Sequence, residues 1–146
     1  AIKKKNICLL LVGAMLIVGM TGCGKNKLKG EWKITEITYD MGDGEIRPVS
    51  NQVFFDSTIA PDYTIKFDDE TCAIIDPYQE NHVIYCDYST EEAALIFEKD
   101  GEAAGYEYKV EGGRLEFTRI SGVQEVYQGG TNYTPTSAVI ACERVE

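Results

Sequence analysis

The chain has 146 residues, of which 44% are hydrophobic and 26% are charged. This composition is typical of one small globular domain, and it excludes a disordered chain and a protein that crosses a membrane many times. The formal net charge of -10 would repel phosphate backbones, so we expect no nucleic-acid partner. A single histidine excludes most histidine-based zinc sites.

Residues 1–22 have the layout of a secretory signal peptide. A cationic start, Lys3 to Lys5, precedes an apolar run from Ile7 to Met20, which is shorter than the roughly 20 residues that span a bilayer as a helix. Met20-Thr21-Gly22-Cys23 resembles the lipobox of bacterial lipoproteins. The resemblance implies lipid attachment at Cys23 and a membrane-anchored, extracytoplasmic position in the cell envelope. The alternative is an ordinary secretory peptide with an incidental cysteine.

Residues 23–29 are short, polar and cationic, with lysines at positions 25, 27 and 29. Such a segment can spread near an anionic membrane surface, so we expect a tether that carries the lipidated cysteine. The domain itself is then expected over residues 30–146.

From Glu31 onward, apolar and polar residues alternate with period 2, and turn signals recur about every 8 to 12 residues. The clearest turn is Gly112-Gly113, a two-residue hairpin loop that would place Val110 opposite Leu115. A slip of one residue would turn every apolar side chain to the wrong face, so the register is well specified.

The same counting predicts a meander of six consecutive strands. Turns at Asp69-Glu70, Pro77 to Asn81 and Asp100-Gly101 continue the pattern, and further strands are expected at Trp32 to Tyr39, Val123 to Tyr127 and Ser137 to Val145. The sequence therefore predicts an all-β fold, an antiparallel up-and-down β-barrel of about eight strands, because closure removes exposed strand edges.

Two connections are long. The first, Asp40 to Asp62, contains the apolar residues Val53-Phe54-Phe55, so it is expected either to seal one end of the barrel or to act as a lid over a ligand cavity. The second, Gln128 to Thr136, is expected to be a wide turn.

Gly30-Glu31-Trp32, at the start of the first strand, resembles the G-x-W signature of lipocalins and bacterial lipocalin-like lipoproteins. The resemblance implies a lipocalin-like barrel in which a basic residue on the last strand, here Arg144, covers Trp32 at the barrel floor. A guanidinium over an indole ring is a cation–π contact worth about 0.5 to 2 kcal/mol. Both residues are expected to be structural.

Three cysteines lie beyond residue 23, and the register places Cys72 opposite Cys86. A disulfide between these two is one expectation, and buried thiols are the other. The chain has no C-x-x-C motif, so neither a metal site nor thioredoxin-like chemistry is expected.

The predicted interior is rich in aromatic side chains, which either fill the barrel or line a narrow pocket for one small ligand. These inward residues are Tyr63, Ile65, Phe67, Phe97, Tyr106, Tyr108 and Phe117. His82 is expected to form an ion pair with Asp76, since no signature supplies a nucleophile for it. We therefore expect no enzymatic activity, no metal and no cofactor. The expected function is binding of a small, partly apolar ligand or an envelope partner, with a rigid interaction module as the alternative.

Overall fold

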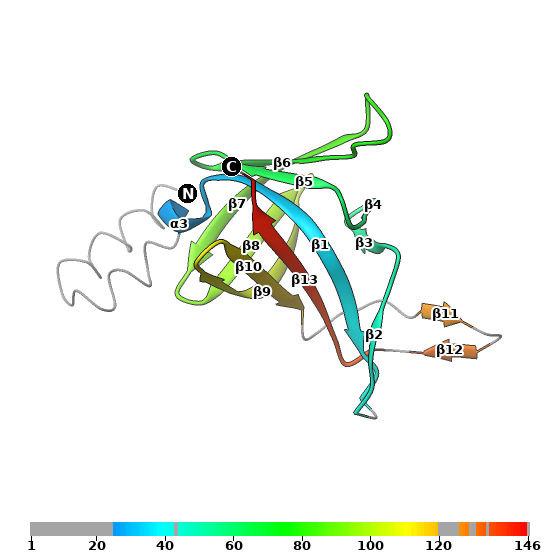
Figure 1. Ribbon diagram of the computed structural model, residues 1–146. Helices are drawn as coiled ribbons and strands as arrows, with labels where there is room; N and C mark the ends of the chain where they lie inside the picture. Colours follow the sequence, from blue (N-terminus) through cyan, green and yellow to red (C-terminus); the bar gives the residue numbers. More distant parts are fainter. Residues whose placement is uncertain (1–24, 43, 120–125, 129–130, 134, 146) are drawn as a thin grey trace.

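A closed antiparallel barrel of eight strands forms the body of the protein (Figure 1). The computed structural model describes residues 25–42, 44–119, 126–128, 131–133 and 135–145. The barrel strands, in order around the wall, are β1 (Gly30–Asp40), β5 (Thr64–Phe67), β6 (Thr71–Ile75), β7 (Val83–Glu91), β8 (Ala94–Lys99), β9 (Glu102–Glu111), β10 (Arg114–Arg119) and β13 (Ser137–Arg144). The predicted fold class is confirmed.

Closure comes from the pairing of the first strand with the last. β1 runs antiparallel to β13 from Trp32 opposite Arg144 to Asp40 opposite Ser137, with one register shift between Ile34 and Glu36. A bulge of this kind bends a strand, which helps a sheet of long strands to curl into a barrel.

The hairpin registers predicted from the turns are present. Val110 lies opposite Leu115 across the Gly112-Gly113 turn. Lys99 lies opposite Glu102 in the β8–β9 hairpin. Inward residues alternate with exposed ones along β9 and β6, as the period of 2 requires.

The long connection between β1 and β5 contains three short strands. β2 (Ile46–Pro48) pairs with the end of β1, whereas β3 (Gln52–Phe54) and β4 (Ser57–Ile59) form a hairpin of their own. Phe54 is buried and its ring lies 5.1 Å from that of Phe97 in the barrel. The β3–β4 hairpin therefore covers one barrel end.

The connection before β13 differs from the prediction. β11 (Val126–Gln128) and β12 (Thr131–Tyr133) pair only with each other, in a separate two-stranded sheet. The segment expected to be a wide turn thus contributes a strand, and residues 123–125 of the expected strand lie outside the described residues. The hairpin extends from the barrel in Figure 1.

The predicted tether also differs from expectation at its carboxyl end. Residues Lys25–Leu28 form the short helix α3, and the Leu28 side chain is completely buried. Leu28 belongs to the hydrophobic core, so the folded domain begins before residue 30.

Candidate functional site

The barrel floor is built around Trp32. The Arg144 guanidinium lies 4.1 Å from the centroid of the Trp32 ring, so the expected contact between the first and last strands is present. The Trp32 indole N–H donates to the Leu28 carbonyl at 2.7 Å. Arg144 donates to the carbonyls of Lys29 and Lys27 at 2.9 and 2.6 Å. These contacts fix α3 to the floor.

Gly30 is required by this arrangement. Its φ of 115° lies in a region that residues with a side chain rarely adopt, and a Cβ there would stand 2.9 Å from a guanidinium nitrogen of Arg144. The glycine of the Gly30-Glu31-Trp32 motif therefore makes room for the arginine that covers the tryptophan.

Six of the seven residues predicted to line a cavity are buried in the interior, and the seventh, Tyr108, also lines a pocket on the outer surface. Tyr63, Ile65, Phe67, Phe97, Tyr106 and Phe117 are each at most 9% exposed, and Tyr108 is half-buried. A water-sized cavity would leave accessible area on its lining side chains. The interior formed by these residues is therefore filled, with the rings of Tyr106 and Phe117 packed edge to face at 5.1 Å.

The end of the barrel opposite the floor is closed by the β3–β4 hairpin, which is not part of the barrel wall. Phe54, Gln52 and Ile59 of the β3–β4 hairpin are all buried. Among the described residues, no backbone hydrogen bond joins this hairpin to a barrel strand. The two pieces are held together by side-chain packing and by Lys99 and Asp56, whose charged groups are 4.0 Å apart.

Among the described residues, two buried side-chain oxygens make no hydrogen bond of ordinary length and angle. They are Gln52 Oε1, on the hairpin, and Tyr106 Oη, on the wall. Burial raises the pKa of Tyr106, and the nearby Arg119 guanidinium opposes that shift through its charge and through its approach to the hydroxyl as a hydrogen-bond donor. The sequence predicted Tyr106 as inward, but Gln52 was missed, because nothing in a single sequence shows that a polar loop residue becomes buried.

His82 and Asp76 form the expected pair, at 3.0 Å. The Asp76 carboxylate also accepts hydrogen bonds from the Tyr63 hydroxyl at 2.9 Å and the Tyr78 backbone N–H at 2.8 Å. Burial tends to raise the pKa of Asp76, but the hydrogen bonds from Tyr78, His82 and Tyr63 together hold it below its ordinary value. The network ties the β6–β7 turn to the residue that precedes β5.

Cys72 and Cys86 lie opposite each other in the register, as predicted. They are free, buried thiols, and Cys142 is a third. The structure therefore has the second of the two expected arrangements, buried thiols, and directly opposed residues in a ladder do not have the easiest bridging geometry. Burial raises the pKa of Cys72 well above its usual range, and the neighbouring Cys86 thiol adds to this effect, so the Cys72 thiol is a poor nucleophile at neutral pH.

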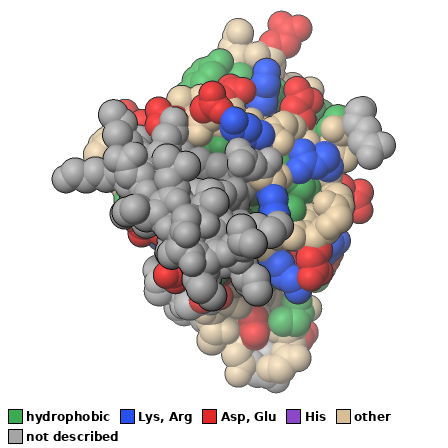
Figure 2. Space-filling model, turned by 90° about the vertical axis from the view of Figure 1, so that its left-hand side faces the viewer, with side chains coloured by type: hydrophobic (Ala, Val, Ile, Leu, Met, Phe, Trp, Pro, Cys, Tyr) green, Lys and Arg blue, Asp and Glu red, His purple; other side chains and the backbone are tan. Residues whose placement is uncertain are grey.

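Charges of both signs are interspersed on the face shown in Figure 2. Ion pairs between exposed groups, such as Lys33 with Asp62 at 3.6 Å, contribute little to stability. This mixture is typical of a solvated surface.

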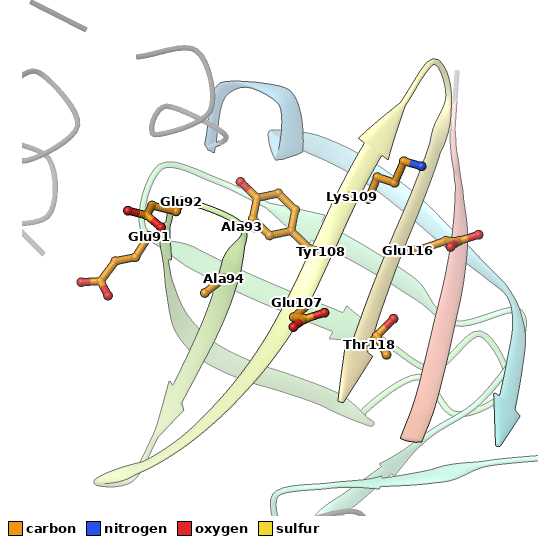
Figure 3. A pocket seen from close by; sticks show the side chains of 9 residues that line it. All are labelled: Glu91, Glu92, Ala93, Ala94, Glu107, Tyr108, Lys109, Glu116 and Thr118. Carbon is orange, nitrogen blue, oxygen red and sulfur yellow. The ribbon is translucent and has the colours of Figure 1, made fainter. Parts of the chain in front are cut away.

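A pocket of about 450 Å³ lies on the outer wall (Figure 3). It is lined by Glu91, Glu92, Ala93, Ala94, Glu107, Tyr108, Lys109, Glu116 and Thr118. Glu107 and Lys109 are exposed residues of β9, so the pocket is a surface depression and not the predicted interior cavity.

Within the part of the chain that the structure describes, no group of three or more acidic, histidine or cysteine side chains is placed to hold a metal ion. Over the same residues, no helix is long and apolar enough to cross a bilayer. Cys23 lies outside the described residues.

Comparison with known proteins gave no match to any family model, curated protein or solved structure.

Proposed function

We propose that this protein is a lipid-anchored, extracytoplasmic lipocalin-like barrel that binds a small, partly apolar ligand without catalysis. The observation that carries the proposal is the closure of one barrel end by the Phe54 side chain of the β3–β4 hairpin. The ring that fills this end belongs to a separate hairpin and not to the wall.

The hairpin is held on the barrel by side-chain burial and not by a strand ladder. Separating it from the barrel would break no ladder hydrogen bond among the described residues, whereas separating any two wall strands would break several. Loop segments with few backbone ties open more readily than the core strands beneath them. Removal of Phe54 from its contact with Phe97 would leave a space with apolar walls, which suits an apolar ligand.

The proposed location rests on the lipobox resemblance of residues 20–23. The folded domain begins near Lys25, because Leu28 is buried and Arg144 binds the carbonyls of Lys27 and Lys29. A lipid on Cys23 would thus be joined to the barrel floor by very few residues. The end covered by the β3–β4 hairpin would point away from the membrane and be open to ligands.

The proposal is tested by calorimetric titration of the wild-type domain with naphthalene, a rigid apolar probe. We expect saturable binding at one site, tightened in Phe54→Ala because the ring that competes for the site is gone. Leu95→Ala is the matched control, since it also removes a fully buried side chain but leaves the hairpin intact. Absence of binding to the wild type, with binding only to the two cavity-forming variants, would refute the proposal, since any engineered apolar cavity can take up such a probe.

A rigid interaction module is the second candidate. It is favoured by exposed apolar side chains on the β6–β7 hairpin, namely Ile75, Tyr78 and Tyr85, the last two being 75% and 69% exposed. Exposed aromatic side chains are common at protein interfaces. Under this alternative, the double variant Tyr78→Ser, Tyr85→Ser would lose binding to its partner protein in the envelope, while Phe54→Ala would retain that binding.

A further inference from the structure

We propose that the pocket on the outer wall binds an aliphatic diamine, a small organic dication with an ammonium group at each end of a hydrocarbon chain. The pocket lies on the outer surface and not in the barrel interior. The inference therefore goes beyond the proposed function and does not depend on it.

The hollow arises from one small residue in the register of the wall. Glu91 of β7 lies opposite Ala94 of β8, and Ala94 lies opposite Glu107 of β9, so the three residues form one row across the strands. Figure 3 shows Ala94 between the two glutamate side chains. Alanine is depleted in strands, and here its short side chain leaves the space between its neighbours open. The volume of about 450 Å³ lies within the usual range of small-molecule sites, about 300 to 1,000 Å³.

Three carboxylates border the pocket without an opposite charge beside them. Among the described residues, no ion pair involves Glu91, Glu92 or Glu107. Like charges around one hollow repel one another, and a bound cation would remove this repulsion. The formal net charge of -10 also raises the concentration of cations near the surface.

The other two charged residues of the lining are already paired. Lys109 is the one basic residue that lines the pocket, and its Nζ lies 3.5 Å from a carboxylate oxygen of Glu111, which is not part of the lining. Glu116 accepts a hydrogen bond from Arg114 at 3.0 Å. The pocket therefore keeps the negative charge of the three unpaired glutamates.

The positions of the carboxylates favour a dication over a metal ion. Neighbouring strands are about 4.8 Å apart, so the Cβ atoms of Glu91 and Glu107, on either side of β8, are separated by about 10 Å. A calcium ion needs six or more oxygen ligands that converge on one point, and no group of the described residues is placed to hold a metal ion. Two ammonium groups joined by a short chain can instead pair with two carboxylates that stand apart.

The surface between the charges suits a hydrocarbon chain. Ala93 and Ala94 line the hollow together with Tyr108, whose side chain is half-buried. In Figure 3 the Tyr108 ring lies beside the row that contains Ala94. The methylene groups of a diamine would contact these apolar atoms, and an ammonium group near the ring face is attracted to it.

The test compares putrescine, a four-carbon diamine, with butylamine, its monoamine counterpart, in an NMR titration of the wild-type domain at low ionic strength. We expect putrescine to bind at one site about fivefold more tightly, the effect of one further ion pair at a surface. In Glu91→Gln and in Glu107→Gln this ratio should fall toward one. Glu102→Gln, which removes an exposed carboxylate of the same strand β9 outside the pocket, is the matched control and should keep the wild-type ratio.

A further variant separates the pocket from the charge around it. Ala94→Leu keeps every carboxylate but fills the hollow, so it should lose putrescine binding while its NMR spectrum remains that of a folded domain. Unchanged putrescine binding in Ala94→Leu, or equal losses in Glu102→Gln and Glu107→Gln, would mean that the acidic surface attracts diamines without a site and would overturn the inference. Equal affinity of the wild type for the two amines would overturn it as well. None of these results would affect the proposed function, because the naphthalene experiment probes the barrel interior.

Discussion

The Arg144 guanidinium covers the Trp32 ring at 4.1 Å, although the two residues stand at opposite ends of the domain sequence. They meet because β1 and β13 pair directly, with Trp32 opposite Arg144. The same guanidinium binds two carbonyls of the segment that precedes β1. One side chain thus joins the start of the domain, its first strand and its last strand.

Shortening the Trp32 or the Arg144 side chain at the barrel floor should lower the free energy of unfolding. We expect Trp32→Ala to lower the free energy of unfolding by about 3 to 5 kcal/mol, as for other large buried side chains. Arg144→Ala should cost less, about 1 to 3 kcal/mol, through the lost cation–π contact and hydrogen bonds. Denaturant unfolding of both variants gives the values. Arg114→Ala, which removes an exposed guanidinium paired with Glu116, is the control and should change stability by less than about 1 kcal/mol. Equal stability of Arg144→Ala and Arg114→Ala would contradict the role assigned to Arg144.

The barrel and its registers could be predicted because the information is local. A two-residue turn at Gly112-Gly113 fixes which residues face each other, and the period of 2 then fixes which of them point inward. The pairing of Cys72 with Cys86 followed from the same counting. Whether two opposed cysteines form a bridge depends on distances that counting does not supply.

The covered end of the barrel could not be predicted in detail, because its contacts join segments far apart in the sequence. Phe54 was recognised as an apolar residue in a long loop, but its packing on Phe97 is a tertiary contact without a local period. The burial of Leu28 was missed for a similar reason, since one apolar residue among lysines reads as part of a polar segment.

The Tyr106 hydroxyl should contribute nothing to stability. Its removal in Tyr106→Phe deletes a buried polar atom without a partner, so we expect unchanged or slightly increased stability in thermal unfolding. Tyr63→Phe is a matched comparison, because the Tyr63 hydroxyl donates to Asp76 and its loss should cost about 1 kcal/mol. If Tyr106→Phe were as destabilising as Tyr63→Phe, the Tyr106 hydroxyl would have a stabilising hydrogen bond, and the adjacent Arg119 guanidinium would be its donor.

The three buried cysteines of the barrel should react with a thiol reagent only when the protein is unfolded. Burial raises the pKa of both Cys72 and Cys142, so a thiol reagent at neutral pH should react slowly with the native domain. In a variant with Cys23 replaced and the leader absent, we expect three thiols after denaturation without reductant. A count of one would show that a disulfide forms in the protein.

Asp76 should make stability depend on pH in the acid range. Its pKa is lowered in the folded state by the hydrogen bonds from Tyr78, His82 and Tyr63, against the opposing effect of burial. A lowered pKa means that the contribution is fully present above the unfolded value and is lost as pH falls through the folded one. We therefore expect the melting temperature of the wild type to fall below about pH 4 more steeply than that of Asp76→Asn. Asp100→Asn, at an exposed turn, should retain the wild-type slope, and parallel slopes for all three proteins would argue against the network.

The lipid anchor is tested at Cys23. If the lipobox resemblance is correct, the mature protein begins with an acylated Cys23, and mass spectrometry of its first peptide should show the added lipid. Cys23→Ala should leave the protein unprocessed or release it from the membrane fraction, because it removes the thiol to which the lipid would be attached. Trp32 donates to the Leu28 carbonyl and Arg144 to the Lys27 carbonyl, and the variant retains all of these residues, so its domain should keep its folded stability. A mature chain that begins at another residue would contradict the anchor, while the barrel and its covered end would stand unchanged.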